Sequence, residues 1–130
     1  MIHGIGTDLV TVGRIGRVHA RFGERFARRF LHAGELPAYR AHADPVRFLA
    51  KRFAVKEAAV KALGTGEREG VLLRDFHVEH DALGRPVLGV SGEAGRRCRA
   101  AGVTALHVSL SDEGDLVCAF VVLERDGAAQ

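Results

Sequence analysis

The stretch from Asp44 to Gly66 constrains the fold more than any other part of the chain, because it carries the signals of a long helix with defined ends. Asp44 can cap the N-terminus, Pro45 suits the first turn, and Gly64 can adopt the left-handed conformation that ends a helix. At about 100° per residue, the apolar side chains fall on two flanking strips. We therefore expect this helix to be mostly buried.

One row of the helix, between the two apolar strips, carries a carboxylate and an ammonium beside small side chains. The row consists of Ala50, Ala54, Glu57 and Lys61. The simplest interpretation is an ion pair between Glu57 and Lys61, because side chains four residues apart on a helix are neighbours. The buried setting and the exit loop of Gly64, Thr65 and Gly66, whose amides can face an anion, favour a ligand site instead.

Length and composition predict one ordinary globular domain. The chain has 130 residues, of which 47% are hydrophobic and 27% charged. No apolar run approaches the roughly 20 residues that span a bilayer, and the residues after Met1 do not have a signal-peptide pattern. We therefore expect a cytoplasmic protein.

Cys98 and Cys118 lack the spacing of a zinc site and are expected to be reduced thiols.

The order of the expected elements predicts an α+β domain. Gly4 and Gly6 lie inside the first expected strand, where glycine often marks the close approach of another backbone or a ligand. We expect further helices at residues 12–30 (with a break near Gly23), 35–41 and 92–101, and strands at residues 1–9, 71–79, 87–90, 105–110 and 116–123. The domain is expected to span residues 1–125, followed by a frayed tail at residues 126–130.

A row of arginines follows the helical repeat between Val12 and Phe30. The row consists of Arg14, Arg17, Arg21, Arg25 and Arg28. Residues 14–29 contain six arginines and one acidic residue, Glu24, so their local charge is +5. Such a one-sign surface predicts docking of an acidic partner. A nucleic-acid backbone would also be attracted, but the chain has few aromatic residues (6%) and no known nucleic-acid-binding module.

Three polar places in the chain suggest one chemistry when they are taken together. They are Asp8, the Glu57/Lys61 row with its exit loop, and the segment His107–Ser109. Two carboxylates without a Cys or His cluster suit Mg²⁺, which takes oxygen ligands and often substrate phosphate oxygens. A lysine and glycine-rich amides suit a phosphate group. Taken singly, Asp8 is more simply interpreted as a helix cap and His107 as a packed strand residue. Together they indicate metal-assisted displacement at phosphorus.

Three motifs resemble those of the holo-[acyl-carrier-protein] synthases, the small 4′-phosphopantetheinyl transferases of bacterial fatty acid biosynthesis. The motifs are Ile5-Gly6-Thr7-Asp8, the segment Arg52–Gly66 with its Lys-Glu-Ala, Lys and Gly-Thr-Gly groups, and His107-Val108-Ser109-Leu110-Ser111. The resemblance extends over nearly the whole chain. It implies a small α+β domain in which an antiparallel sheet packs on the long helix, and a homotrimer with its active sites between protomers.

The resemblance also implies a role for each matching residue. Asp8 and Glu57 match Mg²⁺ ligands that hold the metal on the pyrophosphate of coenzyme A, and Lys61 matches a lysine that stabilises the leaving adenosine 3′,5′-bisphosphate. The residues matching segments that line the coenzyme A site are Gly64, Thr65, Gly66, His107 and Ser109. The reaction is attack by a serine hydroxyl of apo-acyl carrier protein on the β-phosphate. Either Glu57 or a metal-bound water takes the serine proton.

Acyl carrier proteins are acidic, so the arginine row gains a partner from the resemblance, and Arg14 is the one arginine that matches the family. Asp112 departs from it, because many relatives carry His at this position. Two other classes of function are compatible with the arginine row alone. An adaptor for acidic proteins would tolerate Glu57→Gln, and a nucleic-acid-binding module would lose affinity steeply with salt without needing Mg²⁺.

Overall fold

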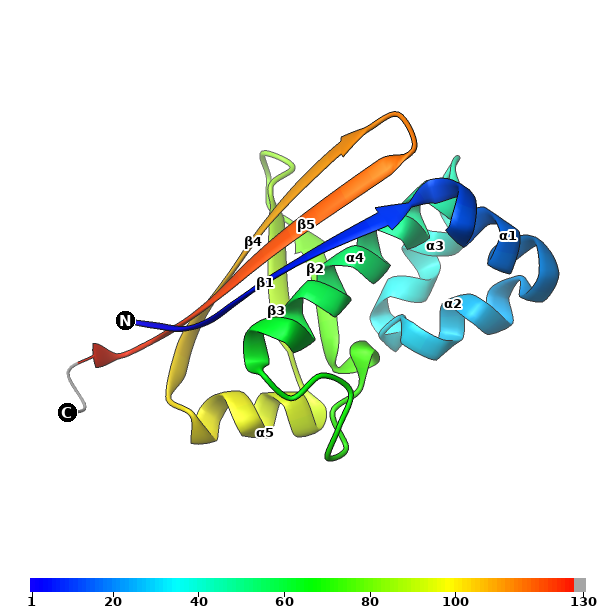
Figure 1. Ribbon diagram of the computed structural model, residues 1–130. Coiled ribbons are helices and arrows are strands. Elements are labelled where there is room, and N and C mark those ends of the chain that lie inside the picture. Colours follow the sequence, from blue (N-terminus) through cyan, green and yellow to red (C-terminus); the bar gives the residue numbers. More distant parts are fainter. Residues whose placement is uncertain (128–130) are drawn as a thin grey trace.

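Three long strands and one long helix form the centre of the molecule (Figure 1). The computed structural model describes residues 1–127. The central strands are β1 (Ile2–Thr11), β4 (Val103–Glu113) and β5 (Leu116–Arg125), and the long helix is α4 (Pro45–Leu63). The other elements are α1 (Val12–Phe22), α2 (Glu24–Phe30), η1 (Ala33–Glu35), α3 (Leu36–Ala41), η2 (Leu73–Asp75), β2 (Phe76–His80), β3 (Pro86–Val90) and α5 (Gly92–Ala100).

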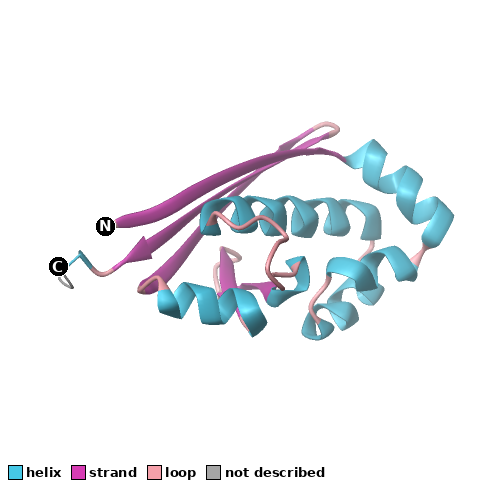
Figure 2. Ribbon diagram, turned by 60° about the horizontal axis from the view of Figure 1, so that its bottom comes forward, coloured by secondary structure: helices cyan, strands magenta, loops and turns pink. Residues whose placement is uncertain are grey.

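The central sheet is antiparallel, with the strand order β1–β5–β4. Helix α4 lies along one face of this sheet, as Figure 2 shows. Strands β2 and β3 form a separate antiparallel pair, the helices α1 to α3 gather at one end of α4, and α5 lies at the other end (Figure 1). The predicted α+β fold, an antiparallel sheet packed on a long buried helix, is confirmed.

Helix α4 begins and ends where its sequence signals predict. The carboxylate of Asp44 accepts a hydrogen bond from the backbone N–H of Arg47 (3.1 Å), and Gly64 adopts the left-handed conformation with φ 92°. Most of the helix is buried, including Ala50 and Ala54 of the row that carries Glu57. Because both flanks are covered, each polar side chain of α4 must contact a polar partner within the protein or face the remaining open space beside the helix.

Glycines bring β1 unusually close to α4. A Cβ atom built at Gly4 would overlap the carbonyl oxygen of Ala62, and one built at Gly6 would overlap that of Ala58. The small side chains of α4 and the missing side chains of β1 therefore allow backbone-to-backbone packing. This is the close approach that the two glycines predicted, and it brings Asp8 onto the helix.

The helix expected at residues 12–30, with a break near Gly23, is confirmed: it is divided at Gly23, which has φ 57° and ψ −137°. Other expected elements differ in their bounds. The strand expected at residues 71–79 begins only at Phe76, because Asp75 closes a 3-10 turn by accepting a hydrogen bond from the backbone N–H of Leu72 (3.1 Å). Strand β4 and strand β5 are both longer than expected.

Two further expectations concern the ends of the chain and membranes. Of the tail expected at residues 126–130, the last three residues lie outside the described part, so both the tail and the domain boundary at residue 125 stay predictions. Within residues 1–127, no helix has the length and apolar character that crossing a membrane requires.

Candidate active site

Asp8 and Lys61 meet between β1 and α4. The side chain of Asp8 points from β1 to the helix side of the sheet and is mostly buried (17% exposed). Lys61 donates hydrogen bonds to Oδ1 of Asp8 (3.2 Å) and to the backbone carbonyl of Thr7 (3.0 Å). In the described chain Lys61 therefore pairs with Asp8 and not with Glu57, and the simple intrahelical ion pair expected from the four-residue spacing is wrong.

The helix-cap interpretation of Asp8 is also wrong, because another residue serves the start of α1. The backbone N–H of Gly13 donates to Oδ1 of Asp115 (3.0 Å), and the backbone N–H of Val12 donates to the Asp115 carbonyl (2.8 Å). The carboxylate of Asp8 is thus available to the space between β1 and α4.

Glu57 is half-buried on α4 and carries an unfavourable charge. Burial raises the pKa of its carboxyl group, and the nearby carboxylates of Glu67 and Asp8 raise it further, against the smaller opposing effects of Lys61 and Arg14. A cation placed between Glu57 and Asp8 would relieve this repulsion. The electrostatics of the two carboxylates therefore favour cation binding.

The donor set suits Mg²⁺. No group of three or more His, Cys, Asp or Glu side chains within residues 1–127 is arranged to hold a metal by itself. A pair of carboxylates matches Mg²⁺, which keeps several waters and completes its coordination with substrate phosphate oxygens. Asp8 and Glu57 fit such a site, and Lys61 places a cation beside it whose side chain is 54% exposed.

A groove of about 690 Å³ opens beside Glu57. Its floor is apolar, and its charged rim combines two carboxylates with the arginines of α2. The floor consists of Val18, Phe22, Phe26, Phe30, Phe53 and Leu73, and the rim of Arg25, Arg28, Arg29, Glu57 and Glu67. The groove thus joins the predicted metal site to part of the predicted arginine row.

The five arginines of the row are all exposed, but they do not form one straight line. The break at Gly23 separates those on α1 from Arg25 and Arg28 on α2. Arg28 is an ion-pair partner of Glu24 (2.9 Å), which Arg40 also binds (2.8 Å), and these hydrogen bonds lower the pKa of Glu24 to about 2. Arg29 reaches the groove although the helical repeat did not include it.

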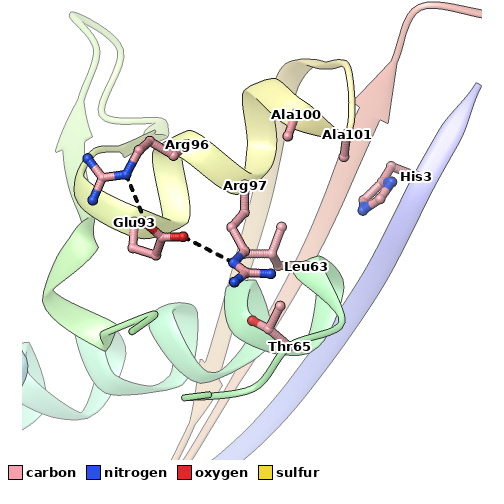
Figure 3. A pocket seen from close by; sticks show the side chains of 8 residues that line it. All are labelled: His3, Leu63, Thr65, Glu93, Arg96, Arg97, Ala100 and Ala101. Atoms are coloured by element: carbon pink, nitrogen blue, oxygen red, sulfur yellow. Dashed lines mark hydrogen bonds and ion pairs between the residues drawn. The ribbon is translucent and has the colours of Figure 1, made fainter. Parts of the chain in front are cut away.

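A second cavity, of about 470 Å³, lies next to the exit loop after α4 (Figure 3). Thr65 lines one side, and Arg96 and Arg97 of α5 line another. Glu93 lies between the two arginines, accepting hydrogen bonds from Arg96 (2.8 Å) and Arg97 (3.2 Å). The sequence indicated arginines on this helix but gave no sign that they face Thr65, because the contact joins segments about 30 residues apart.

Comparison with known proteins agrees with this geometry. Residues 4–121 match the model of the 4′-phosphopantetheinyl transferase superfamily. The chain belongs to this superfamily. It is therefore a transferase, and the resemblance inferred from its three motifs is confirmed.

Its relatives cover nearly the full chain. A holo-[acyl-carrier-protein] synthase of Photorhabdus laumondii is 53% identical over 124 residues, which make up 95% of this chain and 98% of that protein. The crystal structure of the synthase from Neisseria meningitidis has a TM-score of 0.89 at 46% identity, covering 96% of this chain and 100% of that one. The Helicobacter pylori synthase in complex with coenzyme A has a TM-score of 0.78 at 27% identity, covering 92% of this chain and 99% of that one.

In this phosphopantetheinyl transferase, His107 and Ser109 lie on the opposite face of the sheet from Asp8. The strand register places Ser109 beside Phe120 and Thr7, whereas Asp8 lies one residue further along and faces α4. His107 is exposed and its Nε2 lies 3.0 Å from Oε1 of Glu124. A single chain therefore does not bring His107 and Ser109 to the Asp8 and Glu57 carboxylates.

Asp112, the position expected to depart from the family pattern, has a structural partner. Its carboxylate accepts a hydrogen bond from Nη1 of Arg47 (2.9 Å) and lies 3.8 Å from Nζ of Lys51. Arg47 also donates to the backbone carbonyl of Gly114 (2.9 Å). These contacts fasten the turn between β4 and β5 to the first part of α4.

Proposed function

We propose that this transferase moves the 4′-phosphopantetheine group of coenzyme A to a serine hydroxyl of an apo-acyl carrier protein, in an Mg²⁺-dependent reaction that supports fatty acid biosynthesis. The observation that carries the proposal is that Asp8 pairs with Lys61 between β1 and α4, close enough to Glu57 to affect its pKa, and that Glu57 also lines the arginine-rimmed groove. The relatives are holo-[acyl-carrier-protein] synthases, and the crystal structure of one of them is a complex with coenzyme A, which supports the same two substrates.

Each of the three polar side chains has a task in this reaction. Asp8 and Glu57 would hold Mg²⁺, which neutralises the charge of the pyrophosphate and polarises the phosphorus that is attacked. The ammonium of Lys61 donates hydrogen bonds to the phosphate of the leaving adenosine 3′,5′-bisphosphate, where negative charge develops. Thr65 lines the cavity beside the exit loop of α4, and Gly64, Thr65 and Gly66 of this loop would contribute to binding coenzyme A.

The serine proton needs an acceptor as the serine oxygen forms its bond to the β-phosphorus and the bond to the leaving bisphosphate breaks. Glu57 and a water molecule are the two candidates. Burial raises the pKa of the Glu57 carboxyl group in the metal-free chain, whereas Mg²⁺ held by the same carboxylate would lower it, so the pKa favours neither candidate over the other. Either route requires Glu57 in its ionised form.

The acidic carrier protein would dock on the arginine row. Arg25 and Arg28 on the rim of the groove lie on the same cavity as Glu57, so a protein bound there would present its serine near the carboxylates. Exposed arginines of this kind chiefly increase the association rate, and they make it sensitive to salt.

We further propose a homotrimer with active sites between protomers, and a cytoplasmic location. The face of the sheet opposite α4 exposes large apolar side chains, including Ile5 (57% exposed), Leu9 (65%) and Phe120 (43%). His107 and Ser109 lie on this same face. A second copy packed there would supply them to the site of its neighbour.

Mixing two inactive variants tests the shared site. Chains with Asp8→Ala and chains with His107→Ala are each expected to lose most activity, while refolded mixtures of the two should regain it, because some clefts then combine an intact Asp8 with an intact His107. Mixtures that stay inactive, although the two chains co-assemble, would contradict sites between protomers.

The reaction itself is tested by the intact mass of an apo-acyl carrier protein after incubation with the enzyme, coenzyme A and Mg²⁺. We expect a gain of one phosphopantetheine group on the acceptor serine and release of adenosine 3′,5′-bisphosphate. A folded enzyme that modifies none of several apo-carrier proteins, and only binds them, would instead support an adaptor function.

A further inference from the structure

Lys56 is a fully buried lysine in the middle of α4 (0% exposed). Its ammonium donates one hydrogen bond to the backbone carbonyl of Phe30 (2.9 Å) and one to Oε1 of Glu35 (2.5 Å). Glu35 is itself only 5% exposed. The pair is therefore a buried ion pair between the long helix and the segment that follows α2.

Glu35 makes further contacts that fix its carboxylate. The backbone N–H of His32 donates to Oε1 (2.9 Å), the backbone N–H of Val78 donates to Oε2 (3.0 Å), and Nε of Arg52 lies 3.1 Å from Oε2. One carboxylate thus connects α4, the α2–η1 turn and strand β2. The hydrogen bonds from Lys56, His32 and Val78 are directional, so the carboxylate has little freedom to move.

A buried ion pair of this kind is a poor source of stability. Removing two charges from water costs free energy that their attraction often fails to recover, and apolar residues of similar volume commonly stabilise a protein as well or better. Unlike apolar packing, the ion pair fixes a direction at each contact. The position of Lys56 indicates that the pair fixes α2 relative to α4.

Lys56 links two helices that contribute to the groove described above. Phe30, whose backbone carbonyl accepts its hydrogen bond, is the last residue of α2 and lines the groove, and Glu57, the next residue of α4, lines it too. The ammonium also binds a carbonyl at the C-terminus of α2, where a cation interacts favourably with the helix dipole. The arginines of α2 and the carboxylate of Glu57 are thereby held at one separation.

We propose that Lys56, held by Glu35, is a positioning residue that sets the distance between the arginine-bearing helix α2 and Glu57, and so holds the two sides of the docking surface at the separation that the carrier protein spans when it binds. This inference rests on the proposed function, because it assumes that an acidic carrier protein docks on α2. It assigns Lys56 no contact with either substrate.

The test is Lys56→Met, a change that removes the ammonium while keeping an unbranched side chain. Arg52 remains beside Glu35, so the carboxylate keeps a cationic partner. We expect kcat/KM for the apo-carrier protein to fall about 10- to 100-fold, mainly through KM, because small misplacements remote from the chemistry have effects of this size. The dissociation constant of coenzyme A, measured by calorimetry, should change less than about twofold.

A merely structural role predicts a different pattern. Loss of folded enzyme lowers the apparent kcat but leaves KM for the carrier protein unchanged, since the remaining folded molecules are normal. Lys51→Met is the matched control, because Lys51 lies on the same helix with its side chain 37% exposed, and its Nζ lies 3.8 Å from the carboxylate of Asp112. We expect the control to keep the wild-type KM for the carrier protein.

A double variant covers the case in which Lys56→Met fails to fold. Lys56→Met combined with Glu35→Gln removes both members of the ion pair and leaves an amide oxygen to accept from Val78. A folded single or double variant with wild-type KM for the carrier protein would overturn the proposal. An inactive wild-type enzyme would instead overturn the proposed function, so the two failures are distinguishable.

Discussion

Gly6→Ala tests the close packing of β1 on α4, on which the position of Asp8 depends. The added Cβ would overlap the carbonyl oxygen of Ala58 and lie 2.8 Å from the backbone nitrogen of Ala62. These are backbone atoms of a buried helix and cannot rotate away. The strand must therefore retreat by more than about 1 Å to reach ordinary contact distances.

The cost follows from overpacking. Forcing a methyl group into a filled site costs about 1–3 kcal/mol, against a gain of roughly 0.5–1 kcal/mol from replacing glycine in a strand. We expect a net loss of about 1–2 kcal/mol in the free energy of unfolding, measured by urea denaturation. Transfer activity should fall as well, because Asp8 moves away from Glu57 and Lys61 together with β1.

Gly16→Ala is the matched control for Gly6→Ala. A Cβ at Gly16 would meet only Cγ1 of Val46, at an ordinary 3.5 Å, and Gly16 lies in the interior of α1. Alanine should stabilise this helix by about 0.5–1 kcal/mol. The same substitution is thus expected to have opposite signs at the two positions. If Gly6→Ala proved as stable as the wild type, the reasoning about close packing would be refuted.

Three further predictions concern the charge of the site, docking and assembly. Because the pKa of Glu57 is raised above 4.5 and the ionised form is needed, activity at subsaturating Mg²⁺ should fall as the pH drops through that raised pKa, and Lys61→Ala should move this acid limb to higher pH, which a pH–rate profile would reveal. Arg14→Glu should raise KM for the carrier protein about tenfold and weaken its salt dependence while leaving coenzyme A binding nearly unchanged, so equal losses for both substrates would count against docking on the arginines. Phe120→Asp, on the exposed apolar face, should reduce the oligomer to monomers in light scattering and abolish transfer, and an active monomer would argue against sites between protomers.

The parts of the fold that the sequence predicts well depend on local signals. Asp44 and Gly64 mark the ends of α4 through capping and a left-handed turn, and both act within a few residues. Gly4 and Gly6 indicated a close approach correctly, although not which partner approaches. The expected strand at residues 71–79 is shortened because Asp75 closes a turn. In the structure Asp75 and Phe76 are consecutive buried residues, which interrupts the alternation of a strand at this point.

The parts that the sequence does not predict depend on partners distant along the chain. Lys61 pairs with Asp8, 53 residues away, instead of with its helical neighbour Glu57. Lys56 can be buried on α4 because its ammonium donates hydrogen bonds to Glu35 and to the Phe30 carbonyl. Neither partner is apparent from the helical repeat. Alternation along β4 shows that His107 and Ser109 share a face, but the strand register is needed to show that Asp8 lies on the other.

The most direct test of the central claim is the Mg²⁺ dependence of phosphopantetheine transfer in the wild type and in Glu57→Gln, which removes the charge of one carboxylate and keeps its shape. The wild type should lose transfer when Mg²⁺ is chelated and recover it when Mg²⁺ is restored, whereas Glu57→Gln should stay folded and fail to transfer even at high Mg²⁺. Full activity of Glu57→Gln with Mg²⁺ chelated would contradict a metal site built on Asp8 and Glu57.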